Sequence, residues 1–153
     1  MQKITLICVG NLKDKEYISM CEEYKKRISR FAKINIIELK EKNNLENVDQ
    51  IKQSESEEIL AKIDINKTVL FDVASKEQTS EQFAEFLEKW FHSSSEITFV
   101  IGGSYGVSDE VKKKIGTKIS FSCLTFPHQL MRVIFLEQLY RGFTINANKT
   151  YHK

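Results

Sequence analysis

The feature that most constrains the fold is a regular alternation of short apolar runs and helical stretches along the 153 residues. Between the runs, apolar side chains recur at spacings of three and four, which is typical of amphipathic helices. Strands that alternate with helices favour a mostly parallel sheet with helices on both faces, so we expect an α/β fold. The expected strands cover residues 4–9, 34–39, 68–74, 97–101 and 118–122.

The expected helices follow from the same patterns. Thr79 and Gln82 have the spacing of a capping box at a helix start. The helix over 51–62 has few apolar positions, so we expect it to be exposed, after a polar loop that includes Asn44. Another helix is expected over residues 17–31, and one runs from the N-cap Thr79 to Phe91. A short helix is expected to start at Ser108, and the final helix is expected from Pro127 to Phe143.

Length and composition narrow the class of protein. A chain of 153 residues with no visible repeat or linker suits one domain over 1–153. No apolar run approaches the roughly 18–20 residues that span a membrane, and Met1–Gly10 resembles a strand more than a signal peptide. Three scattered cysteines, Cys8, Cys21 and Cys123, argue against a disulfide framework and a zinc site. We therefore expect a cytoplasmic protein that binds no metal and no membrane.

Positive charge is concentrated in the last third of the chain. Residues 1–100 carry 15 basic and 18 acidic side chains, a balance of −3, whereas residues 101–153 carry 8 and 3, a balance of +5. Such asymmetry indicates a polyanionic partner. Chance clustering of surface lysines is the alternative.

Three segments are candidates for a ligand site, because ligands of open α/β sheets bind beyond the carboxyl ends of the strands. They are Ala74–Ser75, Gly102–Gly106 and Ser122–Phe126. The glycine spacing matches neither GxGxxG nor a phosphate-binding loop, which argues against a nicotinamide or ATP site. Alternatively, the glycines form only a tight turn, and the hydroxyls of Ser120, Ser122 and Thr125 only cap the next helix.

Other polar residues each allow two interpretations. Cys123 and His128 could form a nucleophilic pair, or Cys123 could be a small core or pocket residue. Asp72 could be an acid/base group, a ribose anchor or a surface carboxylate. Arg132 and Arg141 could pair with Glu137 or hold phosphates. The terminal Tyr151-His152-Lys153 suits RNA binding, unless it is frayed like most termini.

Four ordered segments resemble the RlmH family, the pseudouridine methyltransferases of ribosomal large-subunit RNA in the SPOUT class. The resemblance runs from Cys8 to the end of the chain. The segments are residues 99–106 (FVIGGSYG), 120–132 (SFSCLTFPHQLMR), 137–141 (EQLYR) and 151–153 (YHK). The combination is specific, although no single segment is.

The resemblance implies a C-terminal trefoil knot, a homodimer and S-adenosylmethionine bound in the knot. The implied reaction is methylation of N3 of a pseudouridine in the helix 69 loop of 23S rRNA, in assembled ribosomes. By position, the cofactor contacts of the family fall on Phe71, Gly102, Gly103, Phe121, Ser122, Cys123, Leu124, Thr125 and Phe126. The family commonly has leucine at Phe71, glycine at Ser75 and alanine at Gly142, so the turn after the third strand is the main departure.

The remaining roles concern catalysis and RNA. The N3 proton must leave, or the anion must be stabilised, before the nitrogen attacks. Candidate helpers are His152, Lys153 and Arg141, with Tyr151 for stacking on a base. The side chains expected to contact RNA are Arg132, Arg141, Tyr151, His152, Lys112, Lys113 and Lys114. A non-catalytic protein that binds the ribosome or its RNA through the same face is the main alternative, and a thiol enzyme built on Cys123 and His128 is another.

Overall fold

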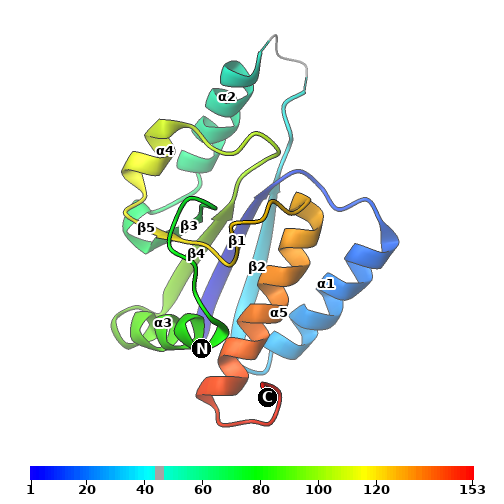
Figure 1. Cartoon of the computed structure of the whole chain (residues 1–153), viewed down its shortest axis with the longest axis vertical. Helices are drawn as coiled ribbons and strands as arrows, with labels where there is room; N and C mark the ends of the chain where they lie inside the picture. Colours follow the sequence, from blue (N-terminus) through cyan, green and yellow to red (C-terminus); the bar gives the residue numbers. More distant parts are fainter. Residues whose placement is uncertain (44–46) are drawn as a thin grey trace.

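The computed structural model describes residues 1–43 and 47–153, which form a five-stranded sheet between two layers of helices (Figure 1). The strand order is β2-β1-β4-β3-β5, and every ladder between neighbours is parallel. The strands are β1 (Gln2–Val9), β2 (Ala32–Leu39), β3 (Thr68–Phe71), β4 (Glu96–Ile101) and β5 (Thr117–Ile119). The parallel α/β architecture expected from the sequence is confirmed.

Alternate side chains of the central strands contribute to two separate hydrophobic cores, because successive residues of a strand point to opposite faces of the sheet. On one face, Leu6 and Phe99 pack with α1 (Lys15–Ile28), α3 (Ser80–Ser93) and α5 (His128–Asn146). On the other face, Ile7 and Val100 pack with α2 (Val48–Leu60) and α4 (Asp109–Lys114). A short 3₁₀ turn, η1 (Ile65–Lys67), leads into β3.

Two strands are shorter than expected. β3 ends at Phe71 because Asp72 begins a turn, in which its carboxylate accepts the Ala74 N–H at 3.0 Å. β5 ends at Ile119, after which the Ser120 hydroxyl donates to the Ser122 carbonyl oxygen at 2.9 Å. Both strands therefore stop where side-chain hydrogen bonds turn the chain toward one edge of the sheet.

The helix expected over 51–62 is not an exposed element, and this prediction is wrong. α2 begins at Val48 and buries Ile51, Glu55, Ser56 and Ile59 against the sheet and the loop after β4. Two polar residues in a buried helical stripe weaken its apolar pattern. Part of the loop expected before this helix, including Asn44, lies outside the described residues.

The helix starts follow the predicted chemistry. Thr79 and Gln82 form the expected capping box, and Ser108 caps α4 through the Val111 N–H. Pro127 stands just before α5 rather than inside its first turn. Among the described helices, none is long and apolar enough to span a membrane.

The loops after β3 and β5 are tied together. The Asp72 N–H donates to the Ile119 carbonyl, and the Gln78 N–H donates to the Ser120 carbonyl, both at 3.0 Å. The Cys123 N–H donates to the Glu77 carboxylate at 2.7 Å. This is the region where the resemblance places the trefoil knot, and the knot itself stays a prediction.

Candidate active site

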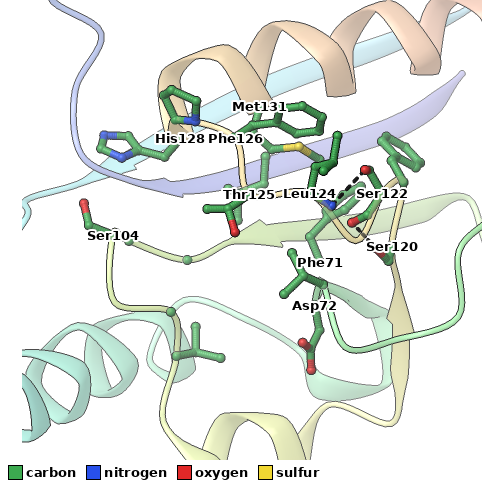
Figure 2. Close-up of a pocket in the computed structure, with 18 of the residues that line it drawn as sticks. Phe71, Asp72, Ser104, Ser120, Ser122, Leu124, Thr125, Phe126, His128 and Met131 are labelled. Atoms are coloured by element: carbon green, nitrogen blue, oxygen red, sulfur yellow. Dashed lines mark hydrogen bonds between the residues drawn. The ribbon is translucent and has the colours of Figure 1, made fainter.

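A pocket of about 730 Å³ lies at the carboxyl ends of β3, β4 and β5 (Figure 2). The three loops that follow these strands form most of its wall, together with Lys112 of α4 and the first turn of α5. Two of these loops hold segments that the strand-end rule predicted from the sequence, Gly102–Gly106 and Ser122–Phe126. After β3, the pocket is lined by Phe71, Asp72 and Val73 rather than by the predicted Ala74 and Ser75. The prediction of where a ligand site would form therefore agrees with the position of this pocket.

The pocket brings together most of the residues predicted to hold a cofactor. Cys123 does not line it, since its side chain is exposed and only its backbone N–H is held, by Glu77. The predicted residues that line the pocket are Phe71, Gly102, Gly103, Phe121, Ser122, Leu124, Thr125 and Phe126.

The glycine loop after β4 is tightly closed. The Gly106 N–H donates to the Gly103 carbonyl at 2.9 Å, and Gly106 has a φ of +79°, which favours glycine. A Cβ on Gly102 would stand 2.9 Å from a Val107 methyl group, and one on Gly103 would stand 2.7 Å from Glu55 Oε1. Glycines at these positions thus let the loop pack against its support while its other side faces the pocket.

That support comes from α2 and the segment before it. The Ser104 hydroxyl donates to Glu41 at 2.9 Å, and the Ser108 N–H donates to the Ser56 hydroxyl oxygen at 2.9 Å. Between them, Glu55 Oε2 accepts the Lys42 N–H, while Oε1 is buried with no hydrogen-bond partner among the described residues. Burial, followed by the nearby Glu41 and Glu58 carboxylates, raises the pKa of Glu55, against the lowering effect of Lys42.

The loop after β5 presents backbone and hydroxyl groups to the pocket. The Leu124 N–H donates to the Ser122 hydroxyl oxygen at 3.0 Å, which turns the chain so that Leu124 and Thr125 face the cavity (Figure 2). Phe71 packs edge-to-face against Phe121 and against Phe135, with ring centroids 4.9 and 5.4 Å apart. An aromatic wall therefore backs a rim of small polar groups.

The structure corrects the role predicted for Arg132. Its side chain is buried, with the residue 2% exposed, and its guanidinium donates to Glu38 at 2.7 Å and to the Gly10 carbonyl at 3.0 Å. A guanidinium enclosed in this way does not reach RNA phosphates. Arg132 instead ties α5 to the ends of β1 and β2.

The C-terminal tail packs against the last turns of α5, far from the pocket. Arg141 donates to Glu137 at 2.9 Å and lies 4.9 Å from the Tyr151 ring centroid. His152 bridges Arg141 and Glu81, at 3.1 and 2.7 Å. Burial above all, with Tyr24 and Glu137 adding to it, raises the pKa of Tyr151 well above its usual range.

The separation follows from the length of α5. His128 at the first turn of α5 lines the pocket, whereas Arg141 stands thirteen residues further along, about 20 Å at 1.5 Å per residue. Figure 1 shows the C-terminus at the far end of this helix from the pocket loops. Within this chain, the predicted catalytic residues therefore lie away from the predicted cofactor residues.

Comparison with known proteins decides the family. A family model described as "Predicted SPOUT methyltransferase" matches residues 2–152. The chain belongs to the SPOUT methyltransferases. Within this family, it is 47% identical over 153 residues to the ribosomal RNA large subunit methyltransferase H of Caldicellulosiruptor saccharolyticus. It is 46% identical over 157 residues to the protein of the same name from Clostridium novyi, and each comparison covers 98% of this chain and 99% of the relative. The family predicted from the four sequence segments is thus confirmed.

A solved structure supports the fold of this SPOUT methyltransferase. It is a probable methylase family protein from Haemophilus influenzae Rd KW20, with a TM-score of 0.50 and 12% identity. The match covers 98% of this chain and 70% of the other.

Several pocket features of this SPOUT methyltransferase were not predicted from its sequence. Glu41 and Glu55 support the glycine loop from behind, and no local pattern distinguishes them from the other acidic residues of that polar stretch. Asp72, for which an acid/base group, a ribose anchor and a surface carboxylate were all open, lines the pocket, as does His128, considered only as a partner of Cys123. His128 does so without Cys123, and this arrangement argues against a thiol enzyme.

Proposed function

We propose that this chain is an S-adenosylmethionine-dependent methyltransferase of ribosomal large-subunit RNA. The proposed acceptor is N3 of a pseudouridine in the helix 69 loop of 23S rRNA, in assembled ribosomes of the cytoplasm. The observation that carries the proposal is the pocket, because residues from three loops that the family resemblance assigns to the cofactor line one cavity. The names of the relatives that are nearly half identical over their whole length support the RNA substrate.

The pocket residues fit S-adenosylmethionine. Phe71, Leu124 and Phe126 offer an apolar wall for a flat ring, and the polar groups of Ser122 and Thr125 lie on the same side of the cavity. The volume of about 730 Å³ is within the range of small-molecule sites. When bound, the cofactor supplies a methyl group that its sulfonium already activates, so the protein has mainly to align two reactants.

The acceptor nitrogen poses the second chemical problem. N3 of a uracil-type ring carries a proton that must leave, or a charge that must be stabilised. Arg141, His152 and Lys153 are the groups proposed for this task, with Tyr151 against the base. Arg141 and His152 are mutually hydrogen-bonded, so each fixes the orientation of the other.

A homodimer would allow Arg141, His152 and Lys153 to act at a pocket, although they lie far along α5 from the pocket of the same chain. In a dimer with two-fold symmetry, the same surface meets itself, and a helix that crosses the axis runs antiparallel to its copy. The C-terminal end of one α5 would then lie beside the first turn of the other, where the pocket is. We therefore propose that the tail of each subunit completes the site of its partner. Lys112, Lys113 and Lys114 next to the pocket would contact phosphates.

The test is transfer of tritium from methyl-labelled S-adenosylmethionine to 70S ribosomes, free 50S subunits and naked 23S rRNA in parallel, followed by mapping of the base. We expect label on one pseudouridine in assembled ribosomes, little label on naked RNA, and full activity of Cys123→Ser. Cofactor binding measured by calorimetry provides the second readout. Ribosome binding without cofactor binding or transfer would show a non-catalytic binding protein instead.

A further inference from the structure

The mouth of the pocket has an apolar rim. Val73, Tyr105 and Leu124 line the cavity and are nevertheless 59%, 53% and 64% exposed. Each stands on a different loop, after β3, β4 and β5 respectively. Large apolar side chains that remain exposed around one cavity mark a surface that a ligand covers.

Tyr105 differs from the other two by its aromatic ring. Within the described residues, its ring packs against no other ring and its hydroxyl takes part in no side-chain hydrogen bond. By contrast, Phe71, Phe121 and Phe135 pack against one another in the deeper wall. The Tyr105 ring is therefore available to a flat partner that enters from solvent.

The backbone beneath the ring is fixed. Tyr105 lies between Gly103 and Gly106, which are joined by the 2.9 Å hydrogen bond, and its neighbour Ser104 is held by Glu41. The backbone of such a closed turn loses little conformational entropy on binding. The ring is thus presented in advance rather than recruited by folding of a loose loop.

Positive charge lines the same pocket as this ring. Lys112 lines the same pocket and Lys113 is exposed next to it, and neither forms a salt bridge within residues 1–43 and 47–153. Lys114, in contrast, pairs with Glu110 at 2.9 Å. An aromatic face next to unpaired ammonium groups suits an unstacked nucleotide, whose base stacks while its phosphate meets the lysines.

We propose that Tyr105 is the stacking platform for an RNA base that is turned out of its helix at the mouth of the pocket. This inference rests on the proposed function and adds a substrate-binding residue that acts within the same subunit as the cofactor pocket. Because the contact is made in the ground state and in the transition state alike, its loss raises KM and leaves kcat unchanged.

The test compares Tyr105→Phe, Tyr105→Leu and Tyr105→Ala in steady-state methylation of 70S ribosomes at saturating cofactor. We expect Tyr105→Phe to stay within about two-fold of the wild type, and the other two to raise KM about ten-fold, the effect of one lost base–aromatic stack. Cofactor affinity, measured by calorimetry, stays unchanged in all three variants and also shows that they are folded. Ile65→Ala, an exposed apolar side chain in η1 away from the pocket, is the matched control.

Three results would overturn the assignment. They are an unchanged KM in Tyr105→Ala, full activity in Tyr105→Leu, and a loss of cofactor affinity that parallels the loss of methylation, since the ring would then cover the cofactor. A wild-type chain that transfers no methyl group overturns the proposed function together with this inference. An active wild type with an equally active Tyr105→Ala overturns only the inference.

Discussion

At the scale of single residues, the glycine loop shows how closely the pocket is fitted to its support. Gly103 lies against Val9 and Glu55, both buried, so neither neighbour has free space to move into. Gly116, in contrast, has no atom within 4 Å of the place of a Cβ. Two glycines on either side of α4 thus have different tolerances to one added methyl group.

We predict that Gly103→Ala lowers the free energy of unfolding by about 1–3 kcal/mol, because its Cβ would stand 2.7 Å from Glu55 Oε1 and 3.1 Å from Val9 Cγ1. Urea denaturation measures the change, with Gly116→Ala as a near-neutral control. The double variant Gly103→Ala with Glu55→Ala should recover part of the loss, since the two sites are in contact. Equal stability of Gly103→Ala and Gly116→Ala would contradict the tight packing.

At the scale of elements, α2 supports the loop after β4. It holds the loop through Ser56 and presents Glu55, a carboxyl group that is 2% exposed, to Gly103. The burial that raises the pKa of Glu55 also means that the folded chain holds this proton more tightly than the unfolded chain does. Folding and protonation of Glu55 are therefore coupled.

The coupling has a definite sign. Below the unfolded pKa of about 4.3, both states carry the proton and Glu55 imposes no penalty. As the pH rises above that value, Glu55 ionises in the unfolded chain before it ionises in the folded chain. The free energy of unfolding therefore falls with rising pH until the pH exceeds the pKa of Glu55 in the folded state. We predict that Glu55→Gln, which cannot ionise, gains stability relative to the wild type between pH 4.5 and pH 8. Thermal unfolding across this range tests it. Glu57→Gln, at an exposed position of the same helix, is the matched control.

At the scale of the whole molecule, α5 separates the proposed cofactor pocket from the proposed catalytic residues. Its first turn belongs to the pocket, and its last turn holds Arg141 and the docked tail. If the partner's tail completes each site, two subunits with different defects should complement each other.

We predict that Gly102→Val, whose side chain would meet Val107, and His152→Ala are each inactive alone. Co-expressed at equal levels, they should recover about a quarter of wild-type activity, because half of the dimers are mixed and each mixed dimer has one intact site. Differently tagged subunits allow the mixed dimer to be purified and assayed in single turnovers. Full activity of His152→Ala alone would exclude the catalytic role of His152, and an inactive mixed dimer would exclude the shared site.

The sequence was sufficient for features that depend on local patterns. Strand and helix order, the capping box at Thr79 and the three pocket loops all follow from periodicity and from the rule on strand ends. The burial of Arg132 and Glu55 was not predictable in this way, because their partners are more than ten residues away along the chain and meet them only in the folded state. The prediction that α2 is exposed was wrong because its buried stripe contains two polar residues, Glu55 and Ser56.

The packing of α5 between α1 and α3 also bears on how the chain is made. β1 has its β4 partner roughly ninety residues later in the chain, and the core over its face, to which α1 and α3 also contribute, is completed by α5. Until Val133, Phe135 and Leu139 arrive, only α1 and α3 cover that apolar face, which stays partly exposed. Non-local pairing of this kind is slow to form, and exposed sheet surface is prone to aggregate. A chain whose translation stalls before α5 therefore exposes apolar surface of the kind that chaperones and proteases recognise.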